Sequence, residues 1–293
     1  MAQAPRENKT RGILWMLLTL LFFISLDTLM KYLMQSYPLI QVTWARFFFA
    51  TIIAIGLAGK RLPTLVISRA PKLQLVRSVL LMSTTGLFNA GIRTTALATA
   101  TTVMFTSPLL VTVLSVPLLG EKVGLRRWIG VAVGFLGAMI VVRPWQSELT
   151  ATGTGVLLIF CSAFFNATYQ ITTRKVRLDE PLTSLLYTAA AGAIVTSLML
   201  PWGWIWPSPL GWIELMGAGV AGGVGHFCLI KAMTYAPASV VAPFSYTSLI
   251  WATILGFLIW GDFPDLWTWM GAALIIGSGL YIFHREGVRR ENR

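Results

Sequence analysis

Three ionisable side chains lie inside stretches that are otherwise apolar enough to cross a membrane. Asp27 interrupts LLFFISLDTLMK, Arg46 lies in TWARFFFA, and His226 lies in GGVGHFCLIK. A carboxylate at the centre of a membrane helix costs about 2.5 to 3.5 kcal/mol on insertion scales, so such a group needs a partner or a function. The chemistry open to the three residues is binding of a cation or an amine, binding of a carboxylate, and transfer of protons.

Each of the three residues has a structural interpretation beside the functional one. Asp27 either faces a water-filled cavity, where it binds a proton, a cation or a substrate amine, or it pairs with Lys31 one helical turn away. Arg46 either binds the carboxylate of a substrate or of Asp27 through its guanidinium fork, or extends to the membrane surface. His226 either relays protons or stays neutral and hydrogen-bonded between helices, which is the commoner case. The sequence leaves these alternatives open.

Uncharged polar residues inside the apolar stretches supply further candidates for a substrate site. Asn166, Tyr169 and Gln170 share one face of a helix at positions i, i+3 and i+4, and they form the best polar cluster on a single element. Most such groups hydrogen-bond across helices, at on the order of 0.6 kcal/mol each, and a minority should line a cavity. The remaining candidates of this kind are Asn89 and Tyr246.

Three prolines, Pro108, Pro117 and Pro243, lie inside the predicted fourth and ninth membrane helices. A proline inside a helix removes a backbone donor and bends the helix, which exposes carbonyl groups or provides a hinge. We therefore treat Pro108 and Pro243 as hinge candidates for a conformational change.

Motifs of common membrane enzymes and of ATP-driven pumps are absent from the sequence. It contains no H-E-x-x-H, no H-x-x-x-x-D, no G-x-x-x-x-G-K-[ST] and no acidic metal cluster. Cys161 and Cys228 lie in apolar stretches at a spacing unlike any zinc or redox motif. We therefore expect no enzyme activity, no ATP hydrolysis, no metal and no cofactor.

The elements that position these residues follow from the composition. Of 293 residues, 56% are hydrophobic and 12% are charged, and a soluble domain carries about twice that share of charge. Ten apolar blocks approach the roughly 20 residues that a helix needs to cross a bilayer. They run over residues 12–34, 39–58, 73–92, 98–119, 125–143, 153–174, 182–203, 211–232, 237–260 and 265–284. The predicted fold is an all-α integral membrane protein with ten transmembrane helices.

The net charge of +12 is high enough to suggest nucleic-acid binding, but the positions of the charges favour another explanation. With the N-terminus in the cytoplasm, most of the 23 Lys and Arg residues fall on that side of the ten helices, and Arg77 is counted among them. This is the positive-inside bias, and it predicts that both termini are cytoplasmic. We expect contacts with membrane lipids and none with nucleic acid.

The two halves of the chain resemble each other. Residues 141 positions apart match around the ends of the fourth and ninth helices, and residues 143 apart match in the first and sixth. The matches include Gly120 with Gly261, Glu121 with Asp262, Trp128 with Trp269, and Lys31 with Arg174. We predict two five-helix repeats, residues 1–148 and 149–293. Because five is odd, the repeats are inverted in the membrane, as in secondary transporters that work by alternating access.

The two repeats end their fourth helices in a similar way, in SPLLVTVLSVPLLGEKVGLRRWIG and APFSYTSLIWATILGFLIWGDFPDLWTWMG. With ten apolar helices in two halves, the chain resembles the EamA branch of the drug/metabolite transporter superfamily over essentially its whole length. The resemblance implies a secondary transporter, and known members include exporters of amino acids and other small metabolites. The chain departs from the family pattern with Asp262 where Glu is common, and with Leu249 where the first half has Pro108.

From the resemblance we expect export of a small-molecule substrate, an aromatic or large neutral amino acid, across a bacterial inner membrane. Transport is either coupled to protons through Asp27 or His226, or uncoupled. A carrier for other metabolites, such as nucleosides or cofactors, is the alternative, and a membrane enzyme or a receptor is a more distant one. The sequence leaves the oligomeric state open.

Overall fold

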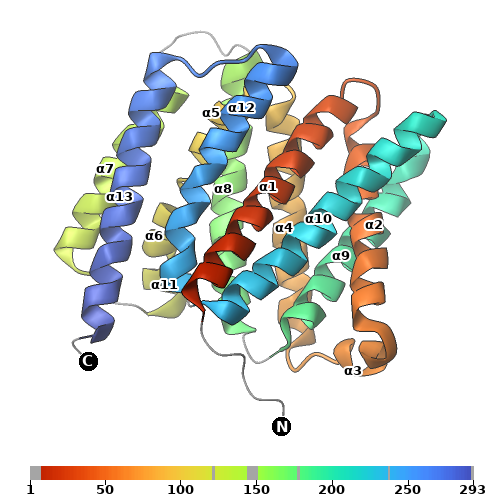
Figure 1. The fold of residues 1–293 in the computed structure, drawn as a ribbon, viewed down its shortest axis with the longest axis horizontal. Helices are drawn as coiled ribbons and strands as arrows, with labels where there is room; N and C mark the ends of the chain where they lie inside the picture. Colours follow the sequence, from red (N-terminus) through yellow and green to blue (C-terminus); the bar gives the residue numbers. More distant parts are fainter. Residues whose placement is uncertain (1–7, 121–122, 144–150, 177–178, 237, 292–293) are drawn as a thin grey trace.

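The chain is helical throughout the residues that the computed structural model describes, which are 8–120, 123–143, 151–176, 179–236 and 238–291 (Figure 1). The longer helices are α1 (Lys9–Leu33), α2 (Leu39–Ala58), α4 (Pro71–Ile92), α5 (Leu97–Met104), α6 (Ser107–Leu119), α7 (Leu125–Val142), α8 (Ala151–Lys175), α9 (Pro181–Met199), α10 (Pro209–Tyr235), α12 (Ser248–Trp260) and α13 (Leu266–Glu291). The short helical segments are η1 (Gly59–Arg61), α3 (Leu62–Leu65), η2 (Leu200–Trp202), α11 (Ala238–Val241) and η3 (Ala242–Thr247).

Most of the predicted membrane spans are present as long apolar helices. Within the described ranges, nine helical stretches are long and apolar enough to cross a membrane, with α5–α6 and η3–α12 each counted as one. The tenth predicted span corresponds to α13, whose apolar part, Leu266–Ile282, is shorter. The prediction of an all-helical membrane protein is therefore confirmed.

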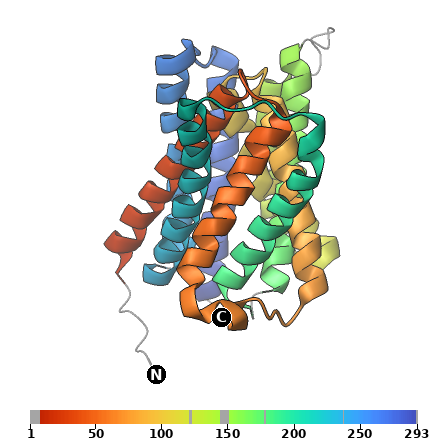
Figure 2. The same ribbon diagram turned by 90° about the vertical axis from the view of Figure 1, so that its right-hand side faces the viewer.

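The helices run side by side in one bundle, and α1 begins at the same end of the bundle at which α13 ends (Figures 1 and 2). We call this end of the bundle the termini end and the opposite end the far end. The α9–α10 and α12–α13 connections lie at the far end, whereas α3 lies at the termini end. Because the chain crosses the bundle several times, each end brings together residues that are far apart in the sequence.

The predicted fourth and ninth helices are both interrupted. The first is divided into α5 and α6, and the second into α11, η3 and α12. Pro108 lies in the first turn of α6 and Pro243 in the first turn of η3, so neither bends a continuous helix. A first-turn proline is tolerated because its missing N–H has no acceptor within the helix. The expected bends are therefore wrong and the prolines mark breaks instead, while their role as hinges stays a prediction.

The two halves of the chain contain matching elements. α6 and α12 have 13 residues each and end at a glycine with left-handed backbone, φ 68° at Gly120 and 71° at Gly261. α1 and α8 have 25 residues each. α1 packs most extensively against α10, and α4 against α8, so the first helix of each half lies against the third membrane helix of the other. These matches support two related halves.

Glycines allow close contacts between the helices. At Gly91 of α4, an added Cβ atom would lie 2.5 Å from Cγ1 of Ile159 and 2.6 Å from the Gly155 carbonyl oxygen, both on α8. At Gly134 of α7, it would lie 2.5 Å from the hydroxyl of Ser278 on α13. Small residues are favoured at such contacts because lipid removes the hydrophobic drive for helices to associate, and close packing replaces it.

The exterior of the bundle is apolar, while part of its interior is polar. Leu258 and Leu266 are each 71% exposed, whereas Gln41, Gln74 and Asn89 are completely buried. Lipid tails solvate apolar side chains, so this distribution is expected of a bundle that spans a membrane. Polar groups that could bind a ligand therefore lie between the helices.

Candidate functional site

Asp27 of α1 and Arg46 of α2 form the charged centre of the candidate site. Both side chains are half-buried, and their charges interact electrostatically. Within the described ranges, neither side chain forms a hydrogen bond, or an ion pair within 4.0 Å. Opposite charges that are close but not in contact leave both groups available to a ligand.

The structural alternative for Asp27, a pair with Lys31, is wrong. The Lys31 ammonium donates to the Thr95 carbonyl oxygen at 3.0 Å and lies 3.2 Å from Oδ2 of Asp262. Asp262 follows α12, in the other half of the chain. Lys31 is therefore neutralised across the two halves, and the i+4 spacing on α1 is not used.

His226 of α10 is hydrogen-bonded within its own helix. Its Nδ1 donates to the Gly222 carbonyl oxygen at 3.0 Å, and its ring lies edge-on to Phe23 of α1, with centroids 5.0 Å apart. A carbonyl oxygen only accepts, so Nδ1 carries the hydrogen. This geometry favours the neutral, interfacial interpretation of His226, and proton relay through its Nε2 stays a prediction.

The structure divides the polar cluster that was predicted on α8. Asn166 accepts hydrogen bonds from Gln170 at 2.6 Å and from Ser107 of α6 at 3.1 Å. Tyr169 instead lies toward α4, where its hydroxyl accepts a hydrogen bond from Arg77 at 2.6 Å. Asn166 and Gln170 thus bind the start of α6, next to the break after α5, and Tyr169 belongs to a different group.

Arg77 is a buried cation whose position the sequence pattern did not predict. It lies in the second turn of α4 and is 6% exposed. Its guanidinium makes four hydrogen bonds of 2.6 to 2.9 Å, to Thr173, to the Ser184 carbonyl oxygen, to Thr188 and to Tyr169. The charge-based count placed this residue with the cations of the cytoplasmic loops; it lies near the same end of the bundle, but inside α4 and buried. All four acceptors are uncharged, which leaves the positive charge of Arg77 within the bundle.

The other two candidates lie apart from this group. Asn89 donates to Thr43 of α2 at 3.1 Å, and its Oδ1 is buried without a partner in the described ranges. Tyr246 of η3 packs edge-on against Phe105, with centroids 5.0 Å apart, at the break between α5 and α6. Asn89 therefore offers one free acceptor, and Tyr246 connects the two interrupted helices.

A polar network joins the two halves at the termini end. Asp179, which follows α8, accepts hydrogen bonds from Ser68, from the Arg69 backbone N–H at 2.9 Å and from Gln74 at 2.9 Å. Burial alone would raise the pKa of Asp179, but these hydrogen bonds outweigh it and hold that pKa below its usual value. The segment before α4 is thereby tied to the α8–α9 loop.

The donor set of the interior suits an organic ligand better than a metal. No group of three or more His, Cys, Asp or Glu side chains in the described ranges could hold a metal ion. Cys161 and Cys228 are free thiols. Charged, amide and aromatic side chains between helices are the groups that orient a small polar molecule.

A bundle of about ten apolar helices with charged side chains between them defines an integral membrane transporter. The chain matches the EamA-like transporter family over residues 10–143 and again over residues 153–283. It therefore belongs to this family, which confirms the resemblance seen in the sequence. The protein is a secondary transporter and not an enzyme.

Relatives with named substrates match nearly the whole chain. The chain is 30% identical to the S-adenosylmethionine uptake transporter of Rickettsia felis, over 94% of this chain and 93% of that protein. It is 31% identical to the riboflavin transporter of Vibrio cholerae, over 96% of this chain and 95% of that protein. A crystal structure that is 18% identical matches it with a TM-score of 0.64, over 94% of this chain and 96% of the other, and supports the fold alone.

The named relatives change the expected substrate. Neither of the two substrates is a proteinogenic amino acid, and the name of the first relative states uptake. Amino-acid export is thus unsupported by these relatives, and the alternative class of nucleosides and cofactors is better supported.

Proposed function

We propose that this protein takes up S-adenosylmethionine across a bacterial inner membrane by alternating access. The observation that carries the proposal is the pair of unbonded opposite charges inside the bundle, Asp27 and Arg46. S-adenosylmethionine has a carboxylate, an ammonium group, a sulfonium group and an adenine ring. It therefore offers an anion to Arg46 and a cation to Asp27. It is also the compound that the name of the R. felis relative gives as its substrate.

The surroundings of the two charges suit the same ligand. The positive charges of Arg46 and Arg77 both act on the region around His226, and they favour a ligand that brings a carboxylate. Phe23 and His226 present aromatic rings at the α1–α10 contact, where an adenine ring would stack.

The proposed mechanism uses two repeats that meet between residues 148 and 149. In this mechanism the five-helix repeats have opposite orientations in the membrane, and the excess of basic residues on one side of the predicted spans supports a cytoplasmic location of both termini. The far end then faces the outside. Exchange of conformation between the repeats would expose the Asp27–Arg46 centre first to that side and then to the cytoplasm.

The test is counterflow in proteoliposomes that contain the purified protein and unlabelled S-adenosylmethionine. We expect saturable entry of labelled S-adenosylmethionine, and no inhibition by a panel of aromatic and large neutral amino acids. Absence of exchange, in vesicles whose protein is monodisperse and folded after extraction, would overturn the proposal. Inhibition by amino acids at equal concentration would restore the amino-acid carrier as the better description.

Riboflavin is the second candidate, because the V. cholerae relative is as similar to this chain as the R. felis relative. Riboflavin is uncharged, so it does not use the Asp27–Arg46 pair. Saturable riboflavin exchange that S-adenosylmethionine fails to inhibit would replace the first candidate with the second.

A further inference from the structure

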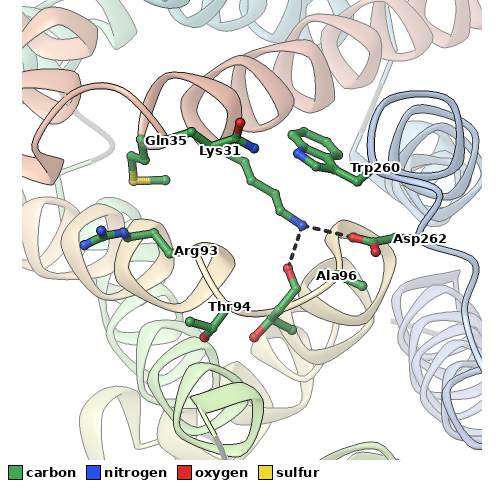
Figure 3. Close-up of a pocket in the computed structure, with 9 residues that line it drawn as sticks. Lys31, Gln35, Arg93, Thr94, Ala96, Trp260 and Asp262 are labelled. Carbon is green, nitrogen blue, oxygen red and sulfur yellow. Dashed lines mark hydrogen bonds and ion pairs between the residues drawn. The ribbon is translucent and has the colours of Figure 1, made fainter.

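A cavity of about 710 Å³ opens at the far end of the bundle. Its walls come from the end of α1, the turn between α4 and α5, and the end of α12 (Figure 3). Cavities of roughly 300 to 1,000 Å³ are the usual size of small-molecule sites. This pocket is separate from the Asp27–Arg46 centre, since neither of those residues lines it.

One side of the pocket is cationic. Arg93, just after α4, is exposed, and its guanidinium has no hydrogen bond or ion pair within the described part of the chain. Five N–H donors in a planar fork are thus open to an anion; such a fork binds a carboxylate or a phosphate, and S-adenosylmethionine carries the carboxylate.

The opposite side of the pocket consists of an ion pair and an aromatic ring. Figure 3 shows Trp260 and Asp262 across from Arg93, with the Lys31 side chain between the two sides. The Lys31 ammonium lies 4.6 Å from the Trp260 ring centroid and 3.2 Å from Oδ2 of Asp262. The Asp262 side chain is 37% exposed, and while one of its oxygens pairs with Lys31, the other has no partner in the described ranges and can accept a hydrogen bond from the ammonium of a ligand.

We propose that this pocket is a docking site for a metabolite with a carboxylate at one end and a cationic or planar aromatic group at the other. The carboxylate binds Arg93, while the cation and the ring bind Asp262 and Trp260. The proposal rests on the proposed function, because it takes the far end as the side from which S-adenosylmethionine arrives. In this proposal Arg93, which lies outside the Asp27–Arg46 centre, selects substrates that carry a carboxylate.

Two substrates that differ only in the carboxylate give the sharpest test. Counterflow of S-adenosylmethionine is compared with counterflow of its decarboxylated form, which keeps the ammonium, the sulfonium and the adenine. We expect Arg93→Gln to raise the KM for S-adenosylmethionine tenfold or more at an unchanged maximal rate, and to leave the KM for the decarboxylated form unchanged. Arg93→Lys should recover part of the loss. Trp260→Leu should raise KM for both compounds.

The matched control is Arg143→Gln. Arg143 follows α7 and is paired with Asp265, the residue directly before α13. Neither residue lines the pocket. The KM values of Arg143→Gln for S-adenosylmethionine and for its decarboxylated form should equal those of the wild type.

The two proposals fail in different ways. If the wild type exchanges S-adenosylmethionine and Arg93→Gln changes neither KM, or changes both equally, the docking site is wrong and the proposed function stands. If the wild type exchanges no S-adenosylmethionine at all, the proposed function fails and the docking site fails with it.

Discussion

The charged residues of the interior differ in what neutralises them. Lys31 has a carbonyl oxygen and the Asp262 carboxylate within 3.2 Å. Arg77 has four uncharged acceptors. In the described ranges, Asp27 and Arg46 have no hydrogen bond and no ion pair within 4.0 Å; they interact electrostatically with each other, and Arg46 also lies 5.9 Å from the Phe47 ring centroid. A buried charge without hydrogen bonds is costly, so the last pair is where a ligand gains most by binding.

Replacing Asp27 with Asn removes the charge and keeps the shape of the side chain. We expect the KM of S-adenosylmethionine counterflow to rise tenfold or more, which corresponds to about 1.4 kcal/mol of binding free energy. Riboflavin exchange, if present, should be unaffected because riboflavin is uncharged. The measurement is the initial rate of counterflow over a range of concentrations.

Asp265→Asn is the control, because Asp265 lies outside the interior and an asparagine still caps the start of α13. Normal counterflow by Asp27→Asn, together with loss of accumulation driven by a pH gradient, would contradict substrate binding and assign Asp27 to proton coupling.

The sequence predicted which residues are unusual but not always where they lie. Asp27, Arg46 and His226 were identified because a charge or an imidazole is rare in an apolar stretch. The partner of Lys31 was missed because Asp262 is 231 positions away, and only the tertiary fold brings them together. Arg77 was missed because it lies near a helix start, where an exposed and a buried arginine have the same sequence pattern.

At the scale of elements, the distinctive feature is the pair of interrupted helices. α5 and α6 are separated at residues 105–106, and η3 precedes α12 at the corresponding place. The apolar pattern continues across both breaks, so hydropathy predicted one helix where two segments exist in the first case and three in the second. Neither break is an effect of proline alone, since Pro117 lies inside α6 without ending it.

Replacing Pro108 or Pro243 with Ala restores a backbone donor at the break. We expect transport to slow severalfold, because a continuous helix could then form across a segment that changes shape during the cycle. The melting temperature of the detergent-purified protein should stay within a few degrees of the wild type. Pro117→Ala is the matched control, and transport by this variant should be unchanged. Wild-type transport rates in both break variants would remove the prolines from the mechanism.

At the scale of the whole molecule, charge and orientation are linked. The termini end carries the exposed cations Lys60, Arg61, Arg69 and Lys72. The far end carries Lys31, Arg93 and Arg143, of which the first and last are paired with carboxylates. The positive-inside rule therefore predicts that the termini end lies in the cytoplasm. The order of the membrane spans was predictable from hydropathy, whereas their lateral packing depends on side-chain contacts that no periodicity reveals.

Single cysteines test this orientation in a background with Cys161 and Cys228 replaced by Ala. Trp206, the site of the first substitution (Trp206→Cys), lies in the α9–α10 connection at the far end and is 80% exposed. Lys72, the site of the second (Lys72→Cys), lies at the exposed start of α4. In intact spheroplasts, a membrane-impermeant maleimide should label Trp206→Cys and should label Lys72→Cys only after lysis. The reverse labelling pattern would show that the termini face outward.

The reciprocal packing of α1 with α10 and of α4 with α8 has a thermodynamic consequence. In a carrier built from two identical halves, the inward-facing and outward-facing states would have the same free energy by symmetry. The populations of the two states without substrate are then set by the positions at which the halves differ. One such position has Pro108 in the first half and Leu249 in the second. A difference of about 1.4 kcal/mol shifts such a population tenfold, which is the size of one or two side-chain contacts. Single substitutions remote from the substrate can therefore change which side of the membrane the idle carrier faces.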